Sequence, residues 1–420
     1  MIETFSLQTG ITLRCFRETR FKQGSISMQF VRPMCREEAA MNALLPAVLL
    51  RGTQKCKDLR AIIRRLDDLY GASVGVQVRR IGDYQTTGLS SSFIDDRFAF
   101  EGDAVLLPMI AFLQELLMQP ALEKGVFVKE YVNSEKKNLI ATIEAQRNDK
   151  RAYASGQMLK TMCAEDSFGI PRLGEIDKVQ SIDAQKLYDH YQKILAESAV
   201  DILYVGSAEP KTVAQHMMGF FADVKRNYIT LPEQTAFHDA GGAERTEQME
   251  VAQGKLAMGF VTPITIRDRR FAAMQVLNTI FGSGMTSKLF TNIREKQSLC
   301  YDISSGYHGS KGIVTVSAGI DFDKKTLVRE QILSQLQACC DGDITPQELQ
   351  AAKQAIISSL QGTHDTPSAI DSYYSSAALS GLAMTPQEYI CAVQAVTAKQ
   401  VVEAAKSVKL HTVYFLEGVR

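Results

Sequence analysis

Val179-Gln-Ser-Ile-Asp-Ala-Gln-Lys-Leu187 is echoed near the other end of the sequence by Val393-Gln-Ala-Val-Thr-Ala-Lys-Gln-Val401. Each copy runs into an amphipathic helix and then into a β-rich stretch that ends in glycine, at residues 202–206 and 414–418. Because both copies keep the same order of helix and strand, they predict two homologous halves.

Local patterns in each half mix strands with helices. Apolar and polar residues alternate along residues 25–31 and 255–260, which predicts a half-buried strand in each half. The stretches Thr345-Pro-Gln-Glu348 and Thr385-Pro-Gln-Glu388 each offer a capping threonine, a proline at the first helical position and a glutamate three residues on. They therefore predict the starts of two helices.

A weaker echo links residues 52–69 to residues 282–299 at a constant offset and supports the same division. Strands that adjoin strands, with long helices between the groups, favour an α+β fold over a doubly wound parallel sheet. We therefore predict two homologous domains, each an antiparallel sheet flanked by helices. The expected parts are an N-terminal domain at 1–226, a linker rich in Gln, Glu, Gly and Thr at 227–250, and a C-terminal domain at 251–420.

Composition excludes several classes of protein. The 420 residues include 47 basic and 47 acidic side chains, so the formal charge is zero, and no basic block marks a nucleic-acid binder. The most apolar window, residues 106–118, contains Pro108, Gln114 and Glu115 and is too short to span a membrane. The N-terminus lacks the pattern of a secretory signal, and the eight cysteines form no CxxC pair. We therefore expect a cytoplasmic protein with reduced thiols.

Common catalytic motifs are missing from the sequence. It contains neither the glycine-rich phosphate loop nor the GxSxG motif of a serine hydrolase. No two of the six histidines lie within eight residues of each other, and residues 1–189 contain none. A short-spaced histidine metal motif is therefore excluded, and each histidine is expected to be a surface or packing residue.

One stretch does offer chemistry. Gly282-Ser283-Gly284 follows an apolar segment, residues 271–281, that is expected to be helical, so the glycines are first interpreted as a helix-ending turn. Further on, Arg294 and Tyr301 are seven residues apart and would project from one face if the segment were helical. A guanidinium and a phenol can both donate to a peptide carbonyl or to a developing oxyanion.

These residues resemble the C-terminal signature of the insulinase/pitrilysin family, which includes the mitochondrial processing peptidases. The similar stretch is Gly282-x-Gly-Met-x-Ser-x-Leu-Phe290 followed by Arg294-Glu-Lys-x-x-Leu-x-Tyr301, with the strand-like residues 312–319 after it. In the N-terminal half, Leu49-Leu-Arg-Gly-Thr53 stands where the family has an LFKGT-like segment. The resemblance covers nearly the whole chain and implies two domains that together form half of a clam-shell chamber.

The sequence departs from the family at the zinc motif. Active members carry H-x-x-E-H just before the Gly-Thr pair, because two histidines one helical turn apart bind Zn²⁺ and the glutamate polarises a water. Here the two histidine positions hold Ala43 and Ala47, and the glutamate position holds Pro46. The third ligand of the family, a downstream glutamate, aligns near Thr142, with Glu130 and Glu135 close by. No cofactor is therefore expected on this chain. Pro46 also predicts that its helix either starts near Leu45 or kinks there.

Taken together, the resemblance implies a non-catalytic subunit of a two-chain zinc peptidase. Its partner would be an H-x-x-E-H-bearing chain of the same family that holds the zinc, and the substrate would be a peptide. Arg294 and Tyr301 would contact the substrate and the tetrahedral intermediate, and the Gly282–Gly284 loop would contact substrate.

Two alternatives stay open. The chain could be a catalytically dead peptide-binding or scaffold protein of the same fold, and a homodimer is open when the chain is expressed alone. An unrelated hydrolase would have to use the Cys300 thiol, or the carboxylates Asp321 and Asp323 at a predicted strand-to-helix boundary. The sequence positions no base beside any of these groups.

Overall fold

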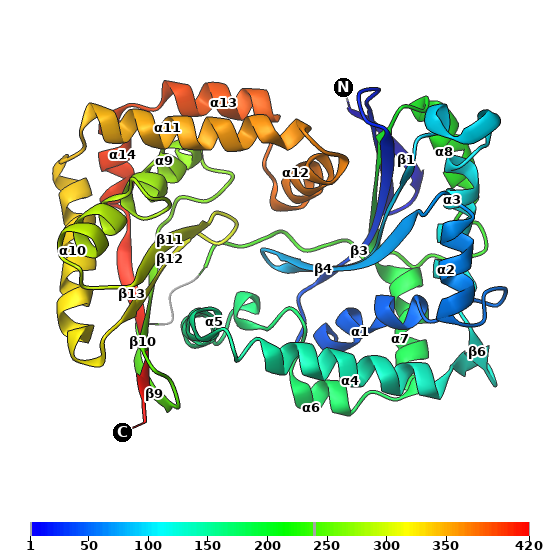
Figure 1. Cartoon of the computed structure of the whole chain (residues 1–420), viewed down its shortest axis with the longest axis horizontal. Coiled ribbons are helices and arrows are strands. Elements are labelled where there is room, and N and C mark those ends of the chain that lie inside the picture. The colour runs from blue at the N-terminus through cyan, green and yellow to red at the C-terminus, as the bar shows by residue number, and fades with distance from the viewer. Residues whose placement is uncertain (1, 238–240, 420) are drawn as a thin grey trace. The chain divides into compact units, whose positions relative to one another are not determined.

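The computed structural model describes residues 2–237 and 241–419 and divides the chain into two compact units (Figure 1). Unit 1 comprises residues 1–143, 170–233 and 364–376, and unit 2 comprises residues 144–169, 234–363 and 377–420. Both units mix helices with a mainly antiparallel sheet, which confirms the predicted α+β class. Unit 1 includes residues 364–376 from the second half of the sequence, and unit 2 includes residues 144–169 from the first half. Neither unit is therefore a continuous stretch of chain.

Unit 1 is built on a six-stranded sheet in the order β1-β2-β8-β3-β5-β4, in which only β2 and β8 run parallel. Its strands are β1 Ile2–Gln8, β2 Ile11–Arg17, β3 Gln23–Pro33, β4 Ser73–Ile81, β5 Tyr84–Ile94 and β8 Ala199–Gly206. Its helices are α1 Ala39–Leu49, α2 Leu59–Asp67, α3 Leu106–Met118, α4 Lys129–Ala145, α6 Ile176–Gln180, α7 Ala184–Glu197 and α8 Pro210–Met218. The small hairpin is β6 Leu122–Glu123 with β7 Val126–Phe127, and the short 3₁₀ turns are η1 Asp96–Phe98 and η2 Phe100–Gly102.

Unit 2 is built on a five-stranded sheet in the order β11-β12-β10-β13-β9. Its strands are β9 Glu244–Met249, β10 Gly254–Val261, β11 Asp302–His308, β12 Ile313–Ile320 and β13 Lys409–Gly418. Its helices are α5 Lys150–Met162, α9 Phe271–Phe281, α10 Lys325–Asp341, α11 Pro346–Gln361, α13 Pro386–Ala395 and α14 Ala398–Ala405, while α12 Pro367–Ser380 belongs mostly to unit 1. The remaining elements are the 3₁₀ turns η3 Ser167–Gly169, η5 Phe322–Lys324 and η6 Gly362–His364, and the π-helix η4 Leu289–Lys296.

The two sheets repeat one topology, as the internal echoes predicted. Reading β9-β13-β10-β12-β11 against β2-β8-β3-β5-β4 gives the same order, with a parallel first pair and antiparallel pairs after it. The strands predicted at 25–31 and 255–260 are β3 and β10, which confirms both. Thr345 and Thr385 each cap a helix through the full reciprocal hydrogen bonds of a capping box, which confirms both predicted helix starts.

The region expected to be a linker contains a strand. Residues 244–249 form β9, which pairs in parallel with β13 at the edge of the unit 2 sheet. Its side chains are mostly charged or polar and mostly exposed, because an edge strand faces water along one side. That polar composition makes the strand indistinguishable from a linker by sequence. Residues 238–240 of the same region, including His238, lie outside the described residues.

Each half of the sequence lends a helix to the other unit. From the first half, α5 packs against β10 and β13, where Met158 and Met162 are buried. The helix can approach this closely because β10 has Gly259, where an added Cβ would lie 2.6 Å from both methionine sulfurs. From the second half, Ile370 of α12 packs with Phe16 and Val205 of unit 1. Composition and periodicity carry no signal for this exchange.

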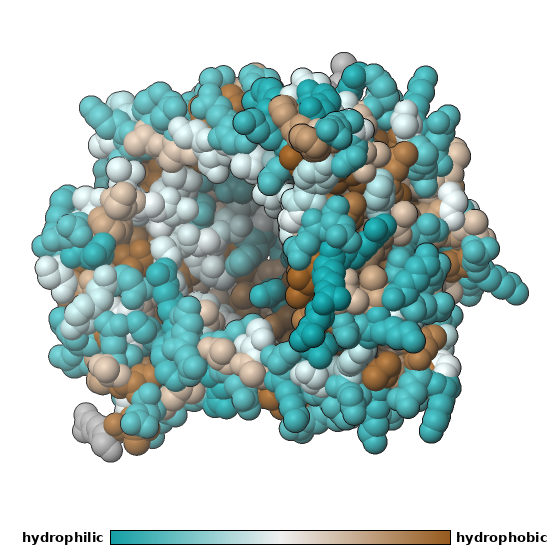
Figure 2. All heavy atoms as spheres, turned by 45° about the vertical axis from the view of Figure 1, so that its right-hand side comes forward, coloured by the Kyte–Doolittle hydropathy of each residue, from teal (hydrophilic) through white to brown (hydrophobic). Residues whose placement is uncertain are grey.

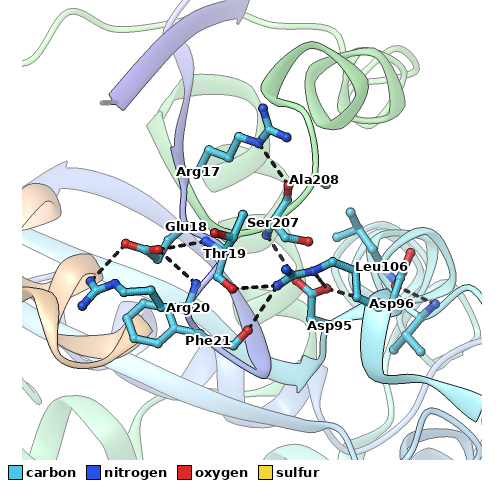
Figure 3. A network of polar contacts seen from close by, with 12 residues as sticks. Arg17, Glu18, Thr19, Arg20, Phe21, Asp95, Asp96, Leu106, Ser207 and Ala208 are labelled. Atoms are coloured by element: carbon cyan, nitrogen blue, oxygen red, sulfur yellow. Dashed lines mark hydrogen bonds and ion pairs between the residues drawn. The ribbon is translucent and has the colours of Figure 1, made fainter.

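One end of the unit 1 sheet is held by the polar network drawn in Figure 3. Asp95, directly after β5, accepts hydrogen bonds from Arg97 Nε at 2.8 Å and from the backbone N–H of Ser207, directly after β8, at 3.2 Å. Arg97 also donates to the carbonyl of Thr19, after β2, at 3.1 Å. Burial acts to raise the pKa of Asp95, but these donors outweigh it and leave the pKa below its ordinary value.

We expect part of the stability of unit 1 to be lost in acid through Asp95. Because its pKa is lower in the folded protein than in the unfolded chain, its contribution is complete above the ordinary value of 3.8 and is lost as the pH falls through the folded-state pKa. Asp95→Asn should therefore flatten the fall in urea midpoint below pH 4. Asp67→Asn removes the same charge at an exposed position of α2 and should leave the acid profile unchanged. Parallel profiles for Asp95→Asn and wild type would contradict this assignment.

No helix among the described residues is both long and apolar enough to cross a bilayer. The face in Figure 2 is mainly polar, with apolar side chains in separate groups.

Candidate functional site

The helix that carries the degenerate zinc motif is continuous. It begins at Ala39 and ends at Leu49 with Pro46 inside it, so the expectation of a start near Leu45 is wrong. A proline has no N–H for the carbonyl four residues before it, which here is Asn42. The hydroxyl of Thr87, on β5, donates to that carbonyl oxygen instead. The sheet thus compensates for the proline, which sequence patterns could not reveal.

Thr87→Val is expected to lower the free energy of unfolding by about 1–3 kcal/mol, because it leaves the buried Asn42 carbonyl without this donor. In a Pro46→Ala background the loss should be smaller, since an alanine at that position can supply the helical N–H. Urea denaturation of the four proteins of this cycle measures the difference. Thr87→Ser retains the hydroxyl and serves as the control. An equal loss in both backgrounds would show that the hydroxyl does not compensate for Pro46.

A buried polar network surrounds the Asn42 side chain of this helix. Asn42 Nδ2 donates to Gln85 Oε1 at 2.8 Å, and His190 Nε2 lies 2.7 Å from Asn42 Oδ1. Gln85 in turn donates to the carbonyls of Ala39 and Arg172. Burial lowers the pKa of His190 to about 4, so the ring is neutral near pH 7. His190 is therefore a packing histidine, as expected.

Ala43 and Ala47 line a cavity of about 530 Å³. Thr142 lies on its α4 wall, so the position expected for the third ligand does face the other two. Glu135 lies on the same wall, whereas Glu130 does not contribute to the cavity. The remaining lining residues are mostly aliphatic or basic: Leu44, Val76, Gln77, Val78, Arg79, Asn138, Leu139, Arg172 and Leu173.

The side chains of this cavity do not fit a zinc ion. Zinc needs nitrogen, sulfur or carboxylate donors, and neither the alanines nor the Thr142 hydroxyl is such a ligand. Glu135 is held by Arg51 Nη1 at 3.1 Å and by Asn138 Nδ2 at 3.1 Å. Within the described residues, no group of three or more His, Cys, Asp or Glu side chains is arranged to hold a metal.

The glycine turn ends helix α9, as its sequence predicted. Gly282 is the C-cap of the helix, and an added Cβ there would lie 2.6 Å from Ser305 Oγ of β11. Gly284 has a φ of +143°, which L-residues rarely adopt. Ser283 between them is exposed. The glycines are therefore required by close packing and by backbone conformation.

Arg294 and Tyr301 come together, but not by lying on one helix. Helix η4, a π-helix, ends at Lys296, so the predicted two-turn helical spacing is wrong. Ser298 turns the chain with a φ of +51°, and the backbone N–H of Tyr301 donates to the carbonyl of Gly319 at 2.9 Å. Both side chains nevertheless line one cavity of about 400 Å³ in unit 2.

Both side chains contact neighbouring residues of unit 2, and both are partly exposed to solvent. The Arg294 guanidinium lies 4.6 Å from the centre of the Phe290 ring and 3.8 Å from Glu295, and its side chain is 39% exposed. The ring of Tyr301 is exposed, and its hydroxyl donates to Asp321 Oδ1 at 2.9 Å. This hydrogen bond raises the pKa of the phenol.

The thiol alternative is disfavoured by the surroundings of Cys300. The residue is buried beside this cavity, and burial raises the pKa of its thiol to about 11. A nucleophilic cysteine needs a lowered pKa instead. Asp321 accepts a hydrogen bond from Tyr301 through one oxygen and pairs with Lys324 through the other. Neither carboxylate oxygen is therefore available as a general base.

Lys288 lies inside the signature but was not predicted to be a site residue. Lys288 is 4% exposed, and its ammonium lies 2.9 Å from Glu348 and 3.4 Å from Asp343. It therefore ties the segment between the glycine turn and η4 to the first turn of α11 and to Asp343 just before that helix. In the sequence, only its position inside the signature could have marked Lys288 as a site residue.

A family model described as the peptidase M16 inactive domain matches residues 181–356. The chain is 29% identical over 416 residues to the probable inactive metalloprotease YmfF of Bacillus subtilis, covering 99% of this chain and 98% of that protein. It is 25% identical over 367 residues to the uncharacterized zinc protease YmxG of the same organism, covering 86% and 84%.

Solved structures of similar fold superpose on the whole length of the chain. A conserved protein from Enterococcus faecalis superposes with a TM-score of 0.93 at 27% identity, covering 100% of this chain and 99% of that one. A peptidase M16 inactive domain from Pseudomonas fluorescens has a TM-score of 0.81 at 17% identity over 100% and 98%, and supports the fold alone. The comparisons therefore confirm the resemblance to the M16, or insulinase/pitrilysin, family: residues 181–356 match its inactive-domain model, and nearly the whole chain is similar in sequence to a probable inactive metalloprotease.

Proposed function

We propose that this protein is the zinc-less subunit of a two-chain M16 peptidase and that it supplies substrate and transition-state contacts at a partner's zinc. The observation that carries the proposal is the cavity shared by Arg294 and Tyr301. Helix α1 meanwhile offers no zinc ligand at its three motif positions. A chain that keeps donors for a reacting carbonyl but lacks the metal is most useful beside a chain that has it.

The chemistry of the two donors fits this division. The Arg294 guanidinium offers a planar set of N–H donors that suits a carbonyl oxygen. When that carbonyl is attacked, charge develops on the oxygen, and donors already aimed there stabilise the transition state more than the ground state. Tyr301 adds one hydroxyl donor. Neither side chain generates a nucleophile, so the chain alone is expected to be inactive.

The relatives support pairing in one respect. Bacillus subtilis has both a probable inactive metalloprotease and an uncharacterized zinc protease that are similar to this chain. An organism with one protein of each kind has the components of a mixed assembly. We place such an assembly in the cytoplasm, where the eight cysteine thiols of this chain would stay reduced.

A second candidate function rests on the cavity of unit 1. The space beside Ala43 and Ala47 is lined mainly by aliphatic side chains together with Arg79 and Arg172, and its one lining glutamate is paired with Arg51. Such a cavity suits an apolar side chain of a bound peptide better than a metal. The chain would then be a peptide-binding or scaffold protein that needs no partner.

Native mass spectrometry with zinc quantitation, on tagged protein recovered from its own cells, distinguishes the two functions. The first predicts a 1:1 complex with a chain of similar size and one zinc, which stays with the other chain on dissociation. Recombinant assembly of the two chains should then cleave unfolded polypeptides, while either chain alone should not. A metal-free monomer or homodimer without an H-x-x-E-H partner would reject the shared-site peptidase and favour the peptide binder.

A further inference from the structure

The hydroxyl of Tyr301 is already occupied by another residue of the chain. It donates to Asp321 Oδ1 at 2.9 Å, and Asp321 Oδ2 lies 2.7 Å from the ammonium of Lys324. All three residues line the cavity that Arg294 also lines. A phenol has one proton, so while it donates to this carboxylate it cannot donate to a peptide oxygen.

Asp321 is not needed for the local backbone. It stands at the N-cap of η5, where aspartate side chains commonly accept a backbone hydrogen bond, yet its side chain makes no cap bond there. Its two oxygens are directed instead to Tyr301 and Lys324. The carboxylate therefore serves the cavity rather than the helix.

Lys324 makes an exchange feasible. If the phenol turned away from an isolated carboxylate, that carboxylate would lose its donor, whereas here the ammonium remains hydrogen-bonded to it. The same contact draws negative charge toward Lys324 and weakens the competition of Asp321 for the phenol proton. The directions of the shifts agree, because the phenol pKa is raised by Asp321 and drawn down by Lys324.

We infer that Asp321 and Lys324 are positioning residues that form a latch on Tyr301: the carboxylate holds the phenol hydroxyl until a peptide oxygen replaces it as acceptor, and Lys324 retains the carboxylate afterwards. The inference deepens the proposed function, on which it rests, by naming how that site is regulated. It predicts that weakening the acceptor at residue 321 favours peptide binding, and does so only when the phenol is present.

The first test uses the isolated chain and needs no partner. The phenol of Tyr301 is followed by NMR of ¹³C-tyrosine-labelled protein and assigned by its loss in Tyr301→Phe. Asp321→Asn should lower the phenol pKa, and Lys324→Met should raise it. Asp323→Asn removes the same charge at an exposed neighbour outside the cavity and is the control. A phenol pKa unchanged by Asp321→Asn would overturn the latch.

The second test measures binding of fluorescein-labelled, carboxymethylated α-lactalbumin, an unfolded polypeptide, by anisotropy. Asp321→Asn should tighten binding about threefold, because a neutral acceptor competes less strongly for the phenol than a charged one. In a Tyr301→Phe background the same substitution should change nothing. Weaker binding by Asp321→Asn, an equal change in both backgrounds or an absence of binding would each overturn the latch.

Failure of the latch and failure of the shared-site peptidase give different results. A 1:1 zinc-containing complex whose peptide binding ignores Asp321→Asn rejects only the latch. The opposite result is a chain that has no zinc-bearing partner but whose Asp321→Asn variant binds the polypeptide more tightly, and only when Tyr301 is present. That result would reject only the shared-site peptidase. Melting temperatures of all variants establish that each one is folded.

Discussion

Arg294→Ala is expected to lower kcat/KM of the assembled two-chain enzyme by about a hundredfold or more, the loss that follows removal of one oxyanion donor. The guanidinium lines the cavity with Tyr301 and packs on the Phe290 ring, so truncation removes both the charge and the fork of donors. The side chain is 39% exposed, and the fold and the pairing should therefore survive. Steady-state cleavage of a labelled polypeptide by the mixed complex measures the effect.

Matched variants separate this role from a general loss of charge. Arg294→Lys keeps the charge but not the planar fork, and should restore only part of the lost kcat/KM. Lys296→Ala removes the same positive charge at an exposed residue outside the cavity and should leave the rate near wild type. If the Arg294→Ala complex assembled normally and cleaved at the wild-type rate, Arg294 would have no part in the reaction.

A zinc site is expected to return when the four motif positions are restored together. The variant Ala43→His, Pro46→Glu, Ala47→His and Thr142→Glu should bind one zinc per chain, whereas the wild-type chain should bind none. Residues 43 and 47 are one turn apart on a continuous helix, and Thr142 lines the same cavity. Pro46→Glu also returns an N–H to the helix. Isothermal titration with Zn²⁺, followed by metal analysis after dialysis, measures the gain.

Partial restorations show whether the geometry is right. Ala43→His alone offers one ligand and should hold no stoichiometric zinc after dialysis. The triple variant without Thr142→Glu lacks a third protein ligand, because Glu135 is held by Arg51, and should bind far more weakly. A folded four-position variant that retains no zinc would show that Thr142 is not the equivalent of the family's third ligand.

Much of the architecture follows from the sequence because it is encoded locally or by repetition. The capping boxes at Thr345 and Thr385 depend on four adjacent residues, and both form as predicted. The alternation along β3 and β10 reports which face of each strand is buried. The echoed segments predicted two homologous halves, and the two sheets share one strand order. The edge strand β9 was missed because its exposed polar residues resemble a linker.

The candidate site was predicted in its residues but not in its geometry. The signature singled out Arg294 and Tyr301, and both line one cavity. The helical spacing invoked to join them was wrong, because η4 ends before Tyr301 and the backbone of that residue is held by Gly319. The sequence indicates Asp321 only as a candidate catalytic carboxylate, because a hydrogen bond across twenty residues leaves no local pattern.

By itself, the sequence determined the repeat, the α+β class and which residues stand at the expected site positions: Ala43, Pro46 and Ala47 on the motif helix, and Arg294 and Tyr301 in the second half. These features depend on residue identity, short-range spacing or internal similarity. Only the tertiary structure decided that Thr87 satisfies the carbonyl freed by Pro46, that α5 and α12 are exchanged between the units, and that Asp321 holds the phenol of Tyr301. Each of these is a contact between residues distant in the chain, and such contacts are set by how the elements pack.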